Sequence, residues 1–260
     1  MDSFVGKTGR QVLNTTNHLL NLFALTCRIF AAARAQRRQG NRLVRKIIIE
    51  QIYFTAVQAL PIVIPVALIT GSAMIIQFSR IAAQAQIDLG KMMVILLVRE
   101  MGPGLTALLV ILRSATSVTI ETSYMNVLGE IETLEMAGID PLRFIALPRL
   151  AGITSAIFSL FILFDLIAII GGYTLVWLLT DLPVASFMGQ IAKAINADDI
   201  VVGLVKAVCF GIIITVTCLY HGFAAKTGFT DIPAATSRAS MECFFFCILA
   251  NGIVSVLFYV

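Results

Sequence analysis

The stretch QIYFTAVQALPIVIPVALITGSAMIIQFS, residues 51–79, contains no charged side chain. At a rise of about 1.5 Å per residue, a helix of this length exceeds the roughly 30 Å hydrocarbon core of a bilayer. Pro61 and Pro65 are sites where such a helix would kink. The stretch therefore predicts one long or tilted membrane-spanning helix.

The rest of the chain has the same character. Hydrophobic residues make up 58% of the 260 residues, charged residues only 13%, and the mean hydropathy is +0.92. These values exclude an ordinary water-soluble domain. Because a charge at the bilayer centre costs at least about 2.5 kcal/mol, the gaps between charges mark the spans. We expect an all-α integral membrane protein, with residues 47–260 as its transmembrane domain and spans at about 52–79, 92–113, 150–180, 200–222 and 241–259.

Basic residues near the span ends predict the orientation, because cytoplasmic loops are enriched in Lys and Arg. An N-terminus on the cytoplasmic side gives that side eleven basic residues and leaves the outer side with Arg80, Lys91 and Lys193. We therefore expect a cytoplasmic N-terminus and a periplasmic C-terminus. The eleven are Arg34, Arg37, Arg38, Arg42, Arg45, Lys46, Arg113, Arg143, Arg149, Lys226 and Arg238.

The N-terminal segment, residues 1–46, has a different pattern. Asn14, Asn17 and Asn21 form a polar stripe at helical spacing, and apolar residues such as Leu19 and Leu22 occupy another face. This pattern predicts an amphipathic helix lying in the inner interface, followed by a basic run beside anionic headgroups. A sixth span is the alternative.

A second amphipathic segment lies between the second and third spans. In GEIETLEMAGIDPLRF, residues 129–144, the apolar residues and the glutamates fall on separate helical faces. Gly138 suits the left-handed position that ends a helix, and Pro141 stops its continuation. We expect a short cytoplasmic helix at about 129–138, with a solvated charged loop as the alternative.

Charges inside the spans are the third signal. Arg99, Glu100 and Lys206 are predicted to lie at one level, about 10 to 12 Å below the outer surface. Glu100 would neutralise only part of the positive charge of Arg99 and Lys206, and the remaining positive charge would suit a phosphate headgroup. Gly102 and Pro103 follow at once and favour a break in the helix. The alternative is a buried ion pair that only fixes helix packing. For Asp165, a hydrogen bond to a neighbouring Ser or Thr is favoured over a role in transport.

Other patterns give no catalytic or metal site. The chain has two histidines, His18 and His221, which are far apart in sequence and lack partner ligands at metal spacing. The five cysteines lie in apolar surroundings and are expected to pack as small hydrophobic residues. Gly6, Lys7 and Thr8 end like a phosphate-binding loop, but its first glycine and preceding strand are missing. We expect no metal, no bound cofactor and no nucleic-acid partner.

Three motifs together resemble the MlaE (YrbE) permease family: VREMGPGLTALL (98–109), GEIETLEMAGIDPLRFIALPRLAG (129–152) and ATSRA (235–239). The resemblance extends from about residue 45 to the end. Its members are membrane subunits of ABC transporters that work with Mce-domain lipid-binding proteins. One departure is the sequence Glu132, Thr133, Leu134, where the family often has Asp-Ala-Leu, which leaves details of ATPase pairing open.

The resemblance implies a homodimer in a bacterial, Gram-negative inner membrane, bound to a cytoplasmic ATPase that holds ATP and Mg. It also implies a periplasmic Mce hexamer, a possible STAS-domain protein and a phospholipid substrate. Residues of the short helix would couple to the ATPase, and charged residues would line a lipid cavity. The coupling residues are Glu130, Ile131, Glu132, Leu134, Glu135, Gly138, Asp140 and Pro141; the cavity residues are Arg99, Glu100, Lys206 and Arg238.

Three other classes remain open. One is a scaffold that anchors other proteins, which would need no charged cavity. An ion-coupled secondary transporter would move its substrate without an ATPase, although no inverted repeat is visible in the sequence. A membrane-embedded lipid-modifying enzyme would need a carboxylate or histidine cluster at one membrane level, and Glu100 has only basic companions in the sequence. A plastid envelope is the alternative location.

Overall fold

The computed structural model describes residues 4–34, 41–85, 89–179, 189, 191, 193–195, 197–225 and 228–259. These residues form helices joined by short turns, with no strand among them. Five stretches are long and apolar enough to cross a membrane, which confirms the predicted all-α integral membrane protein. They are Arg42–Ser79, Lys91–Val127, Leu142–Leu178, Asp198–Ala224 and Phe229–Phe258.

The first span consists of α2 (Asn41–Thr55) and α3 (Leu60–Ala85), joined by the 3₁₀ turn η1 (Val57–Ala59). Pro61 is the second residue of α3. Because proline has no N–H and its ring clashes with the preceding turn, it disfavours regular α-helix just before it. The irregularity therefore falls one turn before Pro61, and Pro65 is accommodated inside α3.

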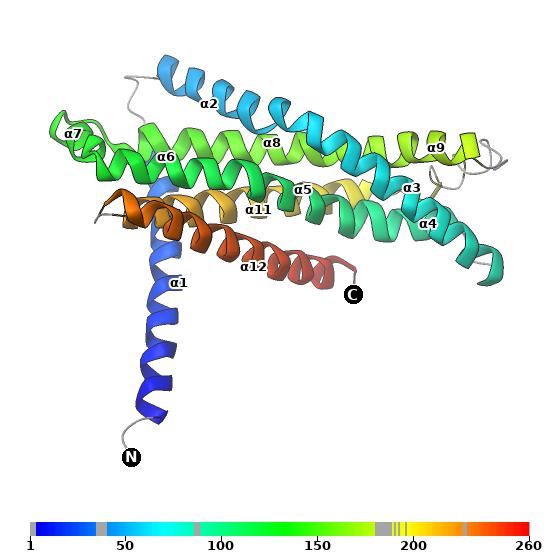
Figure 1. The fold of residues 1–260 in the computed structure, drawn as a ribbon, viewed down its shortest axis with the longest axis horizontal. Coiled ribbons are helices and arrows are strands. Elements are labelled where there is room, and N and C mark those ends of the chain that lie inside the picture. The colour runs from blue at the N-terminus through cyan, green and yellow to red at the C-terminus, as the bar shows by residue number, and fades with distance from the viewer. Residues whose placement is uncertain are drawn as a thin grey trace.

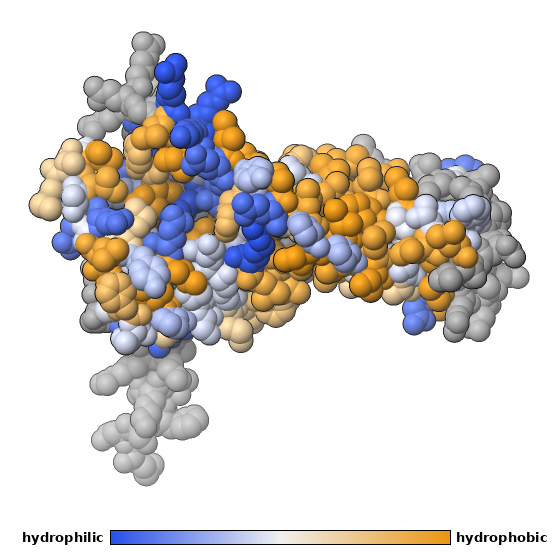
Figure 2. Space-filling model, turned by 45° about the horizontal axis from the view of Figure 1, so that its top comes forward, coloured by the Kyte–Doolittle hydropathy of each residue, from blue (hydrophilic) through white to orange (hydrophobic). Residues whose placement is uncertain are grey.

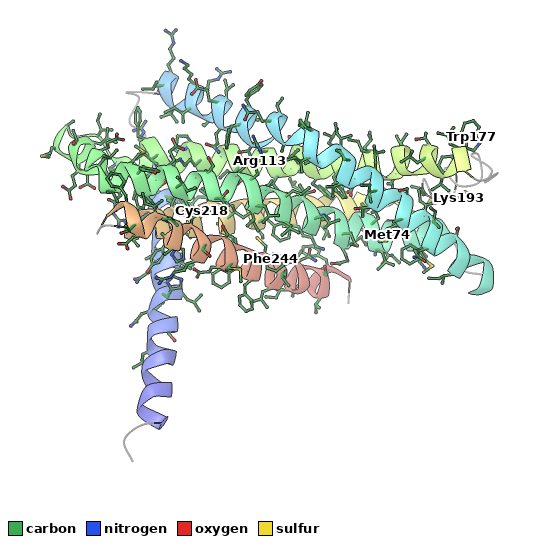
Figure 3. The ribbon with its side chains drawn as sticks, in the orientation of Figure 1. Met74, Arg113, Trp177, Lys193, Cys218 and Phe244 are labelled. Carbon is green, nitrogen blue, oxygen red and sulfur yellow. The ribbon has the colours of Figure 1, made fainter. Side chains whose placement is uncertain are left out.

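The second span is longer than the charge gaps predict. It runs through α4 (Leu89–Met93), the π-helix η2 (Val94–Met101), α5 (Gly102–Val110), the π-helix η3 (Ile111–Ala115) and α6 (Thr116–Val127). The helix was expected to end at Arg113, but it continues for several more turns. The reason is that Arg113 donates hydrogen bonds to the Phe54 carbonyl (2.5 Å) and to Gln58 Oε1 (2.9 Å). Figure 3 shows Arg113 between the first and second spans.

The remaining spans follow the predicted order. The third comprises the π-helix η4 (Leu142–Ala146), α8 (Leu147–Leu166), the π-helix η5 (Ile167–Gly171) and α9 (Gly172–Leu179). The fourth is α11 (Ala197–Ala224), and the fifth is the 3₁₀ turn η6 (Phe229–Asp231) with α12 (Ile232–Tyr259). Residue 180, the predicted end of the third span, and the basic residues Arg37, Arg38 and Lys226 lie outside the described residues.

Spans one and three approach each other through glycine. A Cβ placed on Gly71 would lie 2.0 Å from the carbonyl oxygen of Ala168, and one on Gly172 would lie 2.7 Å from the carbonyl carbon of Gly71. Small residues allow such backbone-to-backbone packing in membrane proteins. Buried Cys218, Cys243 and Cys247 contribute to the packing of α11 and α12, as their apolar surroundings predict. Cys218 is labelled in Figure 3.

The N-terminal helix α1 (Phe4–Arg34) runs across the direction of the five spans, as Figure 1 shows. It is not among the stretches apolar enough to span a membrane, and this arrangement fits the predicted interfacial helix. Leu22 and Ile29 of α1 are buried in a hydrophobic cluster with residues of the short helix α7 (Glu130–Met136), η4, α8 and α11. The shared residues are Ile131, Ile145, Ala146, Leu150, Val216 and Leu219.

The surface agrees with a membrane setting. In Figure 2 a hydrophobic belt occupies the middle of the bundle, and hydrophilic residues gather at the end that carries α7 (Glu130–Met136). On α12, Phe244 and Phe245 are exposed, and Figure 3 shows Phe244 pointing away from the other spans. The exposed apolar side chains therefore lie where lipid or another membrane-embedded surface would contact them.

Candidate functional site

Two regions contain the residues that the sequence singled out. The first is a network of charged side chains inside the bundle, formed by η2, α11 and α12. The second is α7 with its flanking turns, at one end of the bundle (Figure 1).

The network brings Arg99, Glu100 and Lys206 together, as their positions along the spans predict. Lys206 Nζ lies 3.4 Å from Glu100 Oε1 and donates a hydrogen bond to the Arg99 carbonyl at 2.5 Å. It also donates to Ser255 Oγ at 2.7 Å. The Lys206 side chain is fully buried. These contacts therefore replace the hydrogen bonds to water that the ammonium group loses on burial.

Glu100 joins three helices. Its Oε1 accepts a hydrogen bond from Ser255 Oγ at 2.5 Å, and its Oε2 accepts one from Asn251 Nδ2 at 2.8 Å. Both donors lie on α12, whereas Lys206 lies on α11. The carboxylate therefore holds the second, fourth and fifth spans together.

The sequence Gly102–Pro103 has a different effect from the predicted break. The helix continues from η2 into α5. Because Pro103 has no N–H, it cannot make the i→i−4 hydrogen bond to the Arg99 carbonyl. That carbonyl instead accepts from Lys206. π-Helical turns often occur at functional sites, and here η2 carries both Arg99 and Glu100.

The prediction of surplus positive charge is wrong. Arg99 Nε lies 2.7 Å from Oδ1 of Asp199, which is buried on the first turn of α11. Two cations and two carboxylates therefore balance in the network. The side chains of Arg99 and Glu100 are 21% and 35% exposed, so part of the network is still accessible.

Arg238 does not lie at the level of this network. It is exposed on α12, thirteen residues before Asn251, which at 1.5 Å per residue is about 20 Å along the helix. Its place is near the α7 end of the bundle. The structure therefore separates Arg238 from the other three residues that the resemblance assigned to a cavity.

Asp165 is buried on α8, next to Gly102. A Cβ on Gly102 would lie 2.1 Å from Asp165 Oδ1, so only glycine fits there without movement. Asp165 Oδ1 has no hydrogen-bond partner among the described residues. The expected bond from a Ser or Thr to this oxygen is thus not formed in the part of the chain that the structure describes.

The short helix α7 (Glu130–Met136) matches the predicted helix at 129–138. Gly138 has φ +75°. Its N–H donates to the Glu135 carbonyl and the Ile139 N–H donates to the Leu134 carbonyl, each at 2.9 Å. This pair of bonds is the Schellman arrangement that ends a helix with glycine in the left-handed region.

Asp140 and Pro141 begin the third span. The Leu142 N–H donates to Asp140 Oδ1 at 3.0 Å, which caps the first turn of η4. Pro141 immediately precedes η4, where its missing N–H leaves no helical hydrogen bond unmade. These two residues therefore shape the turn, whatever else contacts them.

The faces of α7 divide as predicted. Ile131 is buried in the cluster shared with α1, and Leu134 packs against it. Glu130, Glu132 and Glu135 are exposed. A pocket of about 470 Å³ lies between α7, η4 and α1. It is lined by Leu25, Arg28, Asn126, Ile131, Glu132, Glu135, Asp140, Pro141, Leu142 and Phe223.

Two polar groupings have no obvious signal in the sequence. Arg149 is buried and forms an ion pair with Glu121 at 3.0 Å. His18 and His221 both contact the carboxylate of Glu242. The predicted separation of the two histidines is therefore wrong in space, because α1 crosses α11 and α12. A carboxylate inside the fifth span, Glu242, was the only available hint.

Comparisons with known proteins give a matching family and several relatives. The family model described as "Permease MlaE" matches residues 48–257. A protein of Haemophilus influenzae, named intermembrane phospholipid transport system permease protein MlaE, is 31% identical over 76% of this chain and 78% of its own length. A probable ABC transporter permease protein of Rickettsia conorii is 28% identical over 82% of this chain and 83% of its own. The chloroplastic protein TRIGALACTOSYLDIACYLGLYCEROL 1 of Arabidopsis thaliana is 22% identical, over 81% and 61% of the two chains.

Proposed function

Because this chain belongs to the MlaE permease family, we propose that it moves phospholipid between the inner membrane and a periplasmic Mce-domain protein, driven by a partner ATPase. Its relatives are named as ABC transporter permeases, and it is a multi-pass membrane protein of that kind. ATP and Mg would be bound by the partner, and this chain would supply the lipid path and the mechanical connection.

The observation that carries this proposal is the construction of α7. It lies between the second and third spans, and its exposed face bears Glu130, Glu132 and Glu135. A Schellman turn joins it to η4, and buried Ile131 fixes it to the bundle. A push on this helix is therefore transmitted to two spans and to α1.

The acidic face suggests how the ATPase would bind. Glu132 and Glu135 line the pocket beside α7 together with Arg28. A basic side chain of the ATPase could enter this pocket and pair with either glutamate. The distribution of Lys and Arg supports a cytoplasmic location for this end of the bundle and for the N-terminus.

The charge network would form part of the lipid path near the periplasmic side. Its accessible members are Arg99 and Glu100, while Lys206 is buried as their support. A phospholipid phosphate that reaches Arg99 would compete with Asp199 for the guanidinium group. When lipid is loaded, its phosphate would replace the Asp199 carboxylate at the Arg99 guanidinium group, and the carboxylate would return when the lipid is released. The lipid path would be completed by a second copy of the chain, as in a homodimer.

The coupling role is tested with the purified complex that carries Glu132→Lys and Glu135→Lys together. We expect weaker ATPase binding and a loss of lipid-stimulated ATP hydrolysis, because both charges are reversed at the proposed contact. Glu50→Lys is the matched control, since Glu50 is exposed on α2 and pairs only with Lys46 on its own helix among the described residues. Normal binding and hydrolysis in the double variant would overturn the coupling role. Lipid transfer without any ATPase would favour an ion-coupled transporter.

The lipid path is tested with a photo-crosslinking residue at position 99. The control position is Ile69, which is 68% exposed on the first span and would meet bulk lipid. We expect phospholipid capture at position 99 to change when ATP is added, and capture at position 69 to stay constant. If ATP has the same effect on phospholipid capture at both positions, the charge network serves only helix packing.

A further inference from the structure

His18, His221 and Glu242 come from three different helices and meet at one point. His18 lies on α1, His221 near the end of α11, and Glu242 on α12. The His18 Nε2 contacts Glu242 Oε1, and the His221 Nε2 lies 2.5 Å from Glu242 Oε2. One ligand atom from each residue lies within 4.8 Å of the others.

The donor set has a specific chemical preference. Two imidazole nitrogens and one carboxylate oxygen are typical ligands of Zn²⁺ and of neighbouring divalent transition metals. Zn²⁺ holds such atoms at about 2.0–2.1 Å, which separates the ligand atoms by about 3.3 Å in a tetrahedral site. To reach this spacing, the carboxylate of Glu242 would have to draw back from the two histidine nitrogens, one of which lies only 2.5 Å from it.

The surroundings hold the rings in place. The His18 ring packs edge-on against Tyr220, with ring centroids 4.8 Å apart, and Tyr220 also contacts the His221 ring edge-on at 5.6 Å. A ring orientation fixed by neighbours reduces the entropy lost when a metal binds. A metal ion can reach the three residues, since the side chains of His18, His221 and Glu242 are 28%, 15% and 19% exposed, respectively.

The charge of the cluster also favours a cation. Glu242 lies in the fifth span, where an uncompensated carboxylate is costly. Among the residues that the structure describes, the side chains that pair with it are those of the two histidines, and no Lys or Arg does so. A bound divalent ion would compensate the negative charge of the Glu242 carboxylate.

We propose that His18, His221 and Glu242 form a binding site for a divalent transition metal, with Zn²⁺ as the expected ion. The site joins α1 to the fourth and fifth spans. Bound metal therefore fixes the crossing of α1 over the bundle, next to the hydrophobic cluster that also contains Ile131 of α7. This proposal does not depend on the lipid that the protein moves.

The test uses the full chain in lipid nanodiscs, purified without a polyhistidine tag and carrying Cys27→Ser to remove an exposed thiol. ZnCl₂ is titrated in competition with a chromophoric chelator. We expect one Zn²⁺ per chain. His18→Gln, His221→Gln and Glu242→Gln should each weaken binding by at least about 100-fold, more than the loss of an outer-shell partner usually causes. Glu50→Gln, which removes an exposed carboxylate elsewhere, should bind as the parent does.

A second measurement guards against misfolded variants. Co²⁺ bound to a four-coordinate nitrogen and oxygen site gives visible absorption bands, which His18→Gln should lose while the protein still elutes as the parent does. Zn²⁺ should also raise the Tm of the parent and of Glu50→Gln, but not of His18→Gln, because only a bound metal stabilises the folded state by mass action. The proposal is overturned if the parent takes up no saturable Zn²⁺, or if the three variants bind Zn²⁺ as tightly as the parent does.

Discussion

Lys206 on the fourth span donates a hydrogen bond over 2.5 Å to the main-chain carbonyl of Arg99 on the second span. The carbonyl is available because Pro103, four residues later, has no N–H to offer it. A gap in one helix is thus filled by a buried cation from another. Glu100, the residue after Arg99, forms an ion pair with the same ammonium group, with 3.4 Å between Lys206 Nζ and Glu100 Oε1.

Lys206→Met should destabilise the protein by about 3 kcal/mol, because the Arg99 carbonyl loses its hydrogen-bond donor and the Glu100 carboxylate loses its ion pair and keeps only Ser255 and Asn251 among the described residues. The partial exposure of Glu100 limits the loss. Lys193→Met is the control, since Lys193 is exposed. The measurement is thermal unfolding of the detergent-solubilised protein. Equal stability of the two variants would show that the network contributes nothing to folding.

Gly102→Ala should also destabilise, because the added methyl would lie 2.1 Å from Asp165 Oδ1. Asp165→Ala in the same chain should restore much of the loss by making room. Gly104→Ala has open space around its Cβ and should stabilise slightly, by up to about 1 kcal/mol, as glycine is the poorer helix former. Unfolding midpoints of the four proteins compare these effects. A Gly102→Ala variant with the unfolding midpoint of the parent would refute the close contact between Gly102 and Asp165.

Gly138→Ala should impair coupling more than it impairs folding. The residue has φ +75°, a conformation that costs a non-glycine residue about 1 kcal/mol or more. Relief of that strain would move α7 relative to the third span. Gly138→Asn, which tolerates the left-handed region, should be milder. Lipid-stimulated ATP hydrolysis of the complex is the measurement, and equal rates for the two variants would count against a role for this geometry.

Ile29→Ala should loosen α1 from the bundle. Ile29 is fully buried, and truncation of such a side chain removes about 2–5 kcal/mol of packing. Leu20→Ala is the matched control, because Leu20 is 59% exposed on the same helix. Cysteine crosslinking between α1 and α11 reports the docking. Crosslinking that stays efficient in Ile29→Ala would show that other contacts hold α1.

Charge spacing predicted the number of spans well because each exposed charge in lipid is expensive, so charges accumulate at the ends of helices. It failed where a charge found partners. Spans at 92–113 and 150–180 would make Arg113 and Arg149 the borders of a long connection. Both are instead paired with groups of neighbouring helices, and the second span therefore continues to Val127.

Local signals were equally reliable where the cause is local. Gly138 and Pro141 predicted the end of α7, because left-handed φ and a missing N–H are properties of single residues. They did not predict the start of the third span, which charge spacing puts at about residue 150 and the structure puts at Leu142. The sequence alone thus determined the helical membrane fold, the short acidic helix and the family motifs. Tertiary structure decided the pairing of Arg99 with Asp199 and the meeting of His18, His221 and Glu242. These depend on how helices distant in sequence cross, and helix crossing is fixed by packing across the whole bundle rather than by any one segment.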